Sequence, residues 1–283
     1  MIRTLRPPFP YDRAPYIRAG TALHDVWARL HEGDREPFPD AAFIMQATGA
    51  HPALAQTTAG SPERSAAALQ NAWRAYHCGA FGDALEAGIA LGMLGTNVAN
   101  KASNIHATYL ETDGARKLSI WLASATRAEA LQAAAPDFPN AWYFHAQALG
   151  RYAQCISVAK ALADGLAGRI RRSLERTLAL DASHAEAHIA FGSFHAEIVN
   201  KLGATMAGLT YGAKRDAAMS HFQTALKFLP HSAIARIEYA NALVMLFGRA
   251  RMAEAKRLYR EAAACPPQDA MERLDVDLAK SEL

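Results

Sequence analysis

One order of side chains occurs twice in the second half of the chain, in AMSHFQTALKFLP (residues 218–230) and in AKRLYREAAACPP (residues 255–267). A small residue is followed by a bulky one, then by a second small residue, and then by a proline, at the same spacing in both stretches. These positions hold Ala218, Phe222, Ala225 and Pro230 in the first stretch, and Ala255, Tyr259, Ala262 and Pro267 in the second. A helix-and-turn unit that recurs in this way predicts a stacked helical array.

The pattern has a physical reason. Small side chains let antiparallel helices approach closely, and a bulky neighbour fills the adjoining gap. Proline then stops the return helix. Looser copies of the pattern are Ser124, Ala128, Leu131, Pro136 and Ile170, Leu174, Thr177, Ala182. Helix-forming residues also dominate the composition, so we expect an all-α protein.

We expect about five antiparallel helix pairs over residues 61–267. Ser61, Pro62 and Glu63 are typical of a helix start. The first pair starts at Ser61, and its return helix opens near residue 84. The second pair covers 97–110 and 116–135, and the third starts at 140 and returns through 166–180. The fourth covers 184–199 and 214–229, and the fifth covers 232–247 and 251–264. Residues 1–60 are expected to be a lead-in, with a first helix over 16–31 and a short one over 40–48, which either packs on the first repeat or stays loose. Residues 268–283 are expected to form a C-terminal capping helix.

The first helices of the expected pairs carry a second pattern, whose members are Trp142, His145, Ala146, Leu149 in the third pair and Arg236, Tyr239, Ala240, Leu243 in the fifth. Together with the return-helix pattern, this order resembles the tetratricopeptide repeat (TPR) family. The resemblance implies a TPR-like α-solenoid and a non-catalytic scaffold that binds a peptide or protein partner in a concave groove. The third and fourth pairs carry similar insertions, which look like those of the T-component proteins associated with TRAP-type transporters. Those proteins look exported and lipid-anchored, whereas this sequence shows no leader of that kind, so we do not expect their location and partners to carry over.

If the family geometry holds, first-helix side chains line the groove. Carrying the family positions across repeat by repeat gives Trp73, Tyr76, Lys101, Asn104, Tyr143, Gln147, Arg151, Glu186, Ser193, Glu197 and Asn241. Side-chain amides would bind the main chain of a peptide, Lys101 and Arg151 would bind a carboxylate, and Tyr143 would stack. The alternative is that these residues form an ordinary hydrated surface.

Three asparagines, Asn97, Asn100 and Asn104, share a helix face beside Lys101. Asparagine is a poor residue for a helix interior, so three on one face indicate a reason beyond propensity. Two interpretations are open: the amides bind a ligand, or they make helix-end hydrogen bonds around Gly95.

A histidine group, His184, His188 and His195, also falls on one helix face, and His221 could approach from the return helix. Histidines four residues apart can chelate zinc. However, His188 and His195 take family core positions, where a bulky side chain fills space. We therefore favour core packing over a metal site, and we expect no metal and no cofactor.

Bulk composition limits the partners. The net charge is +3, with 30 Lys and Arg against 27 Asp and Glu, which gives no case for nucleic acid or an anionic membrane. The widely spaced Cys78, Cys155 and Cys265 form neither a disulfide framework nor a zinc signature. The N-terminal stretch lacks the apolar core of a signal peptide, and no run is apolar enough to span a membrane. We expect a soluble cytoplasmic protein.

No motif of catalysis is present: no serine lies in a nucleophile elbow, and no glycine-rich loop follows a strand. The leading hypothesis is therefore a scaffold and not an enzyme. The alternative is a small-molecule binder of a transport or metabolic system, with a pocket between the inserted helices. A metal-dependent enzyme is the third hypothesis.

Met206, Leu209 and Tyr211 in the second insertion would either form a homo-oligomer interface or cover the core.

Overall fold

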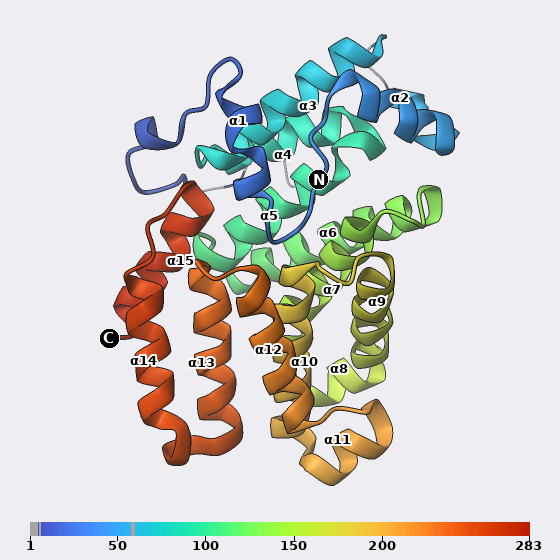
Figure 1. Ribbon diagram of the computed structural model, residues 1–283. Coiled ribbons are helices and arrows are strands. Elements are labelled where there is room, and N and C mark those ends of the chain that lie inside the picture. Colours follow the sequence, from blue (N-terminus) through green and yellow to red (C-terminus); the bar gives the residue numbers. More distant parts are fainter. Residues whose placement is uncertain (1–4, 6, 58–59) are drawn as a thin grey trace. The chain divides into compact units, whose positions relative to one another are not determined.

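The computed structural model describes residues 5, 7–57 and 60–283, and the regular elements of this part of the chain are all helices (Figure 1). This confirms the all-α expectation. The helices fall into two compact units. Unit 1 comprises Arg35–Cys155 and the segment that ends at His31, and unit 2 comprises Ile156–Leu283 and Glu32–Asp34. The sequence pattern did not indicate this division.

Within unit 1, each helix from α3 onward packs against the next one along the chain, and α5 also packs against α3 and α7. The first helices of the pairs, α3, α5 and α7, therefore form a row. The α-helices of this unit are α1 (Ala22–Leu30), α2 (Ala41–Ala50), α3 (Pro62–His77), α4 (Phe81–Ala90), α5 (Thr96–Tyr109), α6 (Gly114–Ala134) and α7 (Pro139–Gln154).

Unit 2 is built in the same way. Its helix α10 packs against α9, α11, α12 and α13, and α13 packs against α14 and α15. The row of first helices here is α10, α13 and α15. The α-helices of this unit are α8 (Val158–Ala163), α9 (Leu166–Leu180), α10 (Ala185–Leu202), α11 (Ala204–Tyr211), α12 (Arg215–Phe228), α13 (Ala233–Phe247), α14 (Met252–Ala263) and α15 (Ala270–Ser281). None of the helices in the described part of the chain combines the length and apolar character needed to cross a membrane.

Helix starts and ends follow the expected local chemistry. The hydroxyl of Ser61 accepts a hydrogen bond from the backbone N–H of Arg64 at 3.3 Å, which caps α3. Ser232 caps α13 in the same way through the N–H of Ala235, at 3.1 Å. Helix α12 ends at Phe228, just before Pro230, as the proline predicts.

The first helix differs from the expectation of 16–31. It begins at Ala22, because Gly20 adopts the left-handed conformation (φ +56°), which an α-helix cannot contain. Ile17, expected on the apolar stripe, is 61% exposed. The lead-in does pack on the first repeat: α2 contacts α3, and the ring centroids of Trp27 and Trp73 lie 5.7 Å apart.

Small residues bring the helices of unit 2 together. The side chains of Ala218, Phe222 and Ala225 are fully buried in α12. A Cβ added to Gly192 of α10 would lie 2.8 Å from the ring of Phe222, so only glycine fits there. In the second quoted stretch Ala255 and Ala262 are fully buried, but Tyr259 is only half-buried, and the neighbouring Leu258 fills the core.

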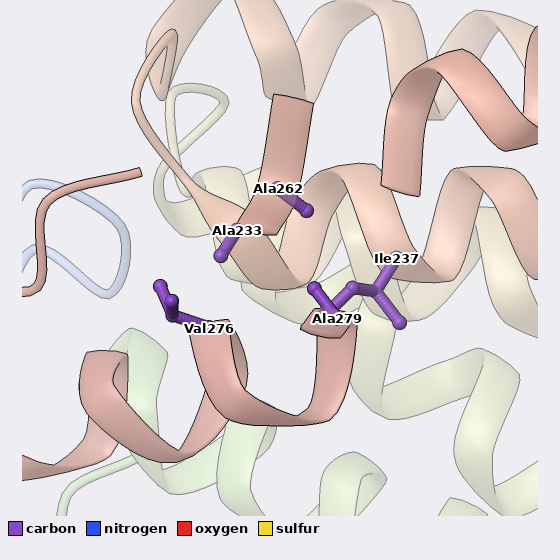
Figure 2. Close-up of a cluster of buried hydrophobic side chains, with 5 residues drawn as sticks. All are labelled: Ala233, Ile237, Ala262, Val276 and Ala279. Carbon is purple, nitrogen blue, oxygen red and sulfur yellow. The ribbon is translucent and has the colours of Figure 1, made fainter. Parts of the chain in front are cut away.

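The C-terminal helix α15 closes one end of unit 2. Val276 and Ala279 of α15 pack against Ala233 and Ile237 of α13 and Ala262 of α14 (Figure 2). All five side chains are at most 5% exposed. The last helix therefore covers apolar surface that the fifth pair would otherwise leave in water.

The third expected pair is divided between the units. Helix α7 packs on α6 and α5 in unit 1, whereas α9 packs on α8 and α10 in unit 2. The two expected insertions contain the short helices α8 and α11. Met206 and Leu209 of α11 are 58% and 82% exposed, so they do not cover the core in the described structure.

Candidate functional site

Two residues expected in the groove, Trp73 and Tyr76, lie instead in an aromatic core. Both side chains are fully buried, and their ring centroids are 5.5 Å apart. The ring of His31 lies edge-on to Trp73 at 4.7 Å. Trp73 faces the lead-in, which the sequence pattern left unplaced, and the ring of Tyr76 meets that of Phe81 of α4, so the groove assignment is wrong for both.

Helix α5 is polar, yet it is buried on every side. Each residue from Leu94 to Ala107 is buried. Burying a polar group is costly unless it finds a hydrogen-bond partner, so this helix depends on bonds to its neighbours. Its buried polar residues are Thr96, Asn97, Asn100, Lys101, Ser103, Asn104 and His106.

Glu36 ties α5 to α7. Its carboxylate accepts hydrogen bonds from the amide nitrogen of Asn97 at 2.9 Å and from that of Asn140 at 2.6 Å. All three residues are buried. The loop before α2, the start of α5 and the start of α7 are therefore held by one carboxylate.

A second chain of hydrogen bonds joins three of the residues expected in the groove. The amide of Asn104 donates to Gln147 Oε1 at 2.8 Å, and the amide of Gln147 donates to the hydroxyl of Tyr143 at 3.0 Å. Asn104 and Tyr143 are buried, and Gln147 is half-buried. Arg151, one turn further along α7, is also partly exposed and donates to Gln154 Oε1 at 3.2 Å. Gln147 is thus the accessible member of this chain, and the partly exposed Arg151 lies one turn from it on α7.

Lys101 does not lie on an open surface. Its side chain is 2% exposed, and its ammonium nitrogen lies 5.8 Å from the centroid of the Tyr76 ring. The ring face attracts the cation, which lowers the cost of burying it. The expectation that Lys101 binds a peptide carboxylate in an open groove is therefore corrected.

The three asparagines of α5 bond to side chains of other elements and not to the helix end around Gly95. Asn97 donates to Glu36, Asn100 accepts from Arg127, and Asn104 donates to Gln147. Each amide also keeps one buried atom without a hydrogen-bond partner among the described residues: Asn97 Oδ1, Asn100 Nδ2 and Asn104 Oδ1. This disfavours the helix-end interpretation, and ligand binding by these amides stays a prediction.

Arg127 of α6 was not foreseen from the sequence. Its Nε donates to Asn100 Oδ1 at 2.8 Å, and its Nη2 donates to the hydroxyl of Ser103 at 2.9 Å. Burial lowers the pKa of Arg127 to about 10. The sequence held one indication of its role. Arg127 directly precedes Ala128, a small residue of the packing pattern, so its charged side chain is brought against the first helix of the pair.

The groove residues expected in unit 2 lie in a different environment. Glu186, Ser193 and Glu197 of α10 are half-buried, and Asn241 of α13 is exposed. The hydroxyl of Ser193 donates to Glu238 at 3.1 Å, which links α10 to α13. The hydroxyl of Tyr259 donates to Asn241, and Glu197 pairs with Lys201 at 3.0 Å. The side chains of Ser193, Asn241 and Glu197 therefore each have a local partner.

The histidine group divides into separate roles. His184 caps α10, since its Nδ1 accepts from the N–H of Ala187 at 3.0 Å. His188 and His221 approach through their Nδ1 atoms at 2.8 Å, and His195 stacks on Phe191 with ring centroids 4.8 Å apart. Among the described residues, no group of three or more His, Cys, Asp or Glu is placed to hold a metal ion. The stacked rings agree with core packing.

Burial shifts the titration of these rings. It lowers the pKa of His195 to about 4, with the charge of Arg171 acting in the same direction and that of Glu175 opposing it. It also lowers the pKa of His221 to about 4, assisted by His188 and His195. These side chains are therefore neutral at pH 7.

The fold resembles that of a known repeat protein. The crystal structure of TTC0263, a thermophilic TPR protein of Thermus thermophilus, has a TM-score of 0.54 and 15% sequence identity, over 76% of this chain and 98% of that one. At this identity the likeness shows the fold alone, and the fold is TPR-like. No protein-family model and no curated protein matches the sequence. The similarity to T-component proteins stays a prediction.

Proposed function

We propose that the chain is a non-catalytic helical-repeat scaffold that binds a peptide or protein segment along the first helices of its repeats. The TPR-like fold supports this proposal, because such arrays present successive first helices side by side. In unit 1 these helices are α3, α5 and α7, and in unit 2 they are α10, α13 and α15.

The observation that carries the proposal is the chain of hydrogen bonds from Asn104 through Gln147 to Tyr143. It joins two neighbouring first helices and fixes Gln147, whose half-buried amide can both donate and accept. Arg151 lies one turn away on the same face of α7. An amide and a guanidinium at this spacing suit the main chain and a carboxylate of a peptide.

Trp73, Tyr76 and Lys101 are not part of this proposal, because their side chains are buried. Asn104 and Tyr143 are also buried, so they act by positioning Gln147 and not by touching the partner. The partner contacts that we propose in unit 2 are Glu186, Ser193, Glu197 and Asn241. A small-molecule site near the inserted helices α8 and α11, a homo-oligomer and a cytoplasmic location stay predictions.

A peptide library displayed on phage, selected against the full chain, tests the proposal. We expect enrichment of a sequence motif, and isothermal titration of the corresponding synthetic peptide should give a Kd that rises at least about tenfold in Gln147→Ala and in Arg151→Ala. Arg249→Ala is the matched control, because Arg249 is exposed on the turn before α14 and should leave Kd unchanged. Enriched peptides that bind both α7 variants as tightly as the parent protein would refute the proposed site.

A further inference from the structure

The guanidinium of Arg127 is held on one edge only. Arginine has five N–H donors, and the two that Arg127 uses lie on the Nε and Nη2 side, toward Asn100 and Ser103 of α5. The end of the group formed by Nη1 and the second N–H of Nη2 has no hydrogen bond within the described residues. This is the edge with which arginine binds a carboxylate or phosphate through two parallel bonds.

Arg127 also lacks a negative partner. No carboxylate of the described residues lies within ion-pair distance of Arg127, and no nearby charge contributes to the shift of its pKa. The side chain is half-buried, so water stabilises the charge incompletely. Buried charges are normally paired, and an unpaired guanidinium that keeps some exposure is suited to a negative ligand from solution.

Asn100 supplies a second unused donor beside Arg127. Because the Nε–H of Arg127 is a donor, it fixes the oxygen of the Asn100 amide toward itself. The nitrogen of the same amide then has no partner in the described part of the chain, and the side chain of Asn100 is fully buried. Asn100 therefore offers the guanidinium a neutral amide oxygen and no compensating negative charge.

Ser124 adds a third group. It lies one turn before Arg127 on α6, so the two residues are neighbours on the surface of that helix. Its hydroxyl is buried and has no hydrogen-bond partner among the described residues. Ser124 is therefore a further buried donor of α6, one turn from Arg127 along the helix.

We propose that the free edge of Arg127, whose other edge is held by Asn100 and Ser103 of α5, is a binding site for an oxyanion, a carboxylate or phosphate group, in unit 1. Arg127 makes the charged, bidentate contact through Nη1 and Nη2, while Asn100 and Ser103 fix the orientation of the guanidinium. The site uses the second helix of a pair. It is separate from Gln147 and Arg151, and it does not depend on the peptide-binding proposal.

Thermal unfolding of the full chain, measured while one anion is titrated at constant ionic strength, tests this site. The probes are succinate for a carboxylate and inorganic phosphate for a phosphate, with chloride as the reference salt. We expect at least one probe to raise Tm saturably by roughly 3 °C or more above the chloride reference. The probe that saturates at the lower concentration identifies the oxyanion class.

Two variants locate the effect. Arg127→Met should weaken anion binding at least about tenfold, and Arg249→Met, an exposed arginine, should not change it. Asn100→Asp places a carboxylate of the same shape beside the guanidinium. This internal anion should raise Tm of the ligand-free protein and abolish the response to added anion, so this test does not depend on a variant that loses its fold.

The proposal is overturned if neither succinate nor phosphate gives a saturable shift in the parent protein. It is equally overturned if Arg127→Met, folded as judged by circular dichroism, retains the full response. A ligand-free Asn100→Asp protein that is less stable than the parent and still responds to anion would contradict it as well. None of these results bears on peptide binding at Gln147 and Arg151.

Discussion

Gly192 of α10 and Phe222 of α12 are in such close contact that a single added carbon on Gly192 would lie 2.8 Å from the aromatic ring. The contact joins the two helices of the fourth pair. Phe222 is fully buried and stacks on Tyr239 of α13, with ring centroids 5.2 Å apart, so it has no room to retreat.

Gly192→Ala should lower the free energy of unfolding by about 1–3 kcal/mol, because the methyl group overpacks the contact with Phe222. Gly150→Ala is the matched control, since Gly150 is also inside a helix and has no neighbouring atom within 4 Å of an added Cβ. There the better helix propensity of alanine should stabilise the protein by up to about 1 kcal/mol. Urea unfolding of both variants measures the two changes in the free energy of unfolding. Two changes of the same sign would contradict the described contact.

Stability should fall between pH 6.5 and pH 4. His195 and His221 have pKa values lowered from 6.5 to about 4, so between these pH values the unfolded chain binds protons that the folded chain does not. The contribution of the two neutral rings to the free energy of unfolding is complete above pH 6.5, and it is lost progressively as the pH drops toward 4. Allowing for solvent screening of these partly accessible rings, we expect a loss of about 1–3 kcal/mol per histidine.

Chemical denaturation at a series of pH values measures this loss. His221→Phe removes one titrating ring and can still stack on Phe191, whose ring centroid lies 4.7 Å from that of His221. The pH dependence of this variant should therefore be flatter. His24→Gln is the control, because His24 is exposed on α1, and its slope should match that of the parent. A flat parent profile from pH 7 to pH 4 would show that these rings are not held neutral.

Replacing Glu36 should destabilise unit 1 strongly. Glu36→Ala leaves the amides of Asn97 and Asn140 without their acceptor, and we expect a loss of about 2–4 kcal/mol. Glu36→Gln keeps one acceptor oxygen and should lose about half as much. Glu86→Ala, on the exposed face of α4, should change stability by less than about 0.5 kcal/mol. Calorimetric unfolding distinguishes these three outcomes, and a Glu36→Ala protein as stable as Glu86→Ala would be inconsistent with the described bonds.

The packing of α15 can be tested with two matched valines. Val276→Ala removes two methyl groups from the cluster shown in Figure 2 and should cost about 1–3 kcal/mol. Val244→Ala makes the same change at an exposed position of α13, where no cost is expected. Guanidinium unfolding of both proteins is the measurement. The same cost at both positions would mean that α15 does not seal the end of unit 2.

Much of the fold was predictable because its signals are local. Ser61 and Pro230 act through the backbone next to them, so they mark where helices begin and end whatever packs around them. Ala218 and Phe222 likewise carry a spacing that is visible in the sequence. The start of α1 was missed, since the left-handed conformation of Gly20 depends on how the lead-in folds back.

The candidate site was less predictable, because burial depends on which other elements pack around a helix. Family positions placed Trp73 and Lys101 on the first helices correctly, but the lead-in and the adjoining helices enclose them. Arg127 was missed for a similar reason: its significance comes from its bonds to Asn100 and Ser103 on another helix, and its place next to Ala128 in the sequence does not show which residues it contacts. The asparagines were noticed, and their partners could be found only from the structure.

The enclosure of α5 restricts which substitutions this helix can accept. A typical surface helix tolerates change on its outer side, so a saturation scan reveals a repeat of 3.6 positions. From Thr96 to Ala107 every position is buried, so α5 has no outer side on which sequence can drift. Natural variation of this protein should therefore leave an unbroken block of slowly changing residues here, where charge and hydrogen bonding are selected as strictly as size.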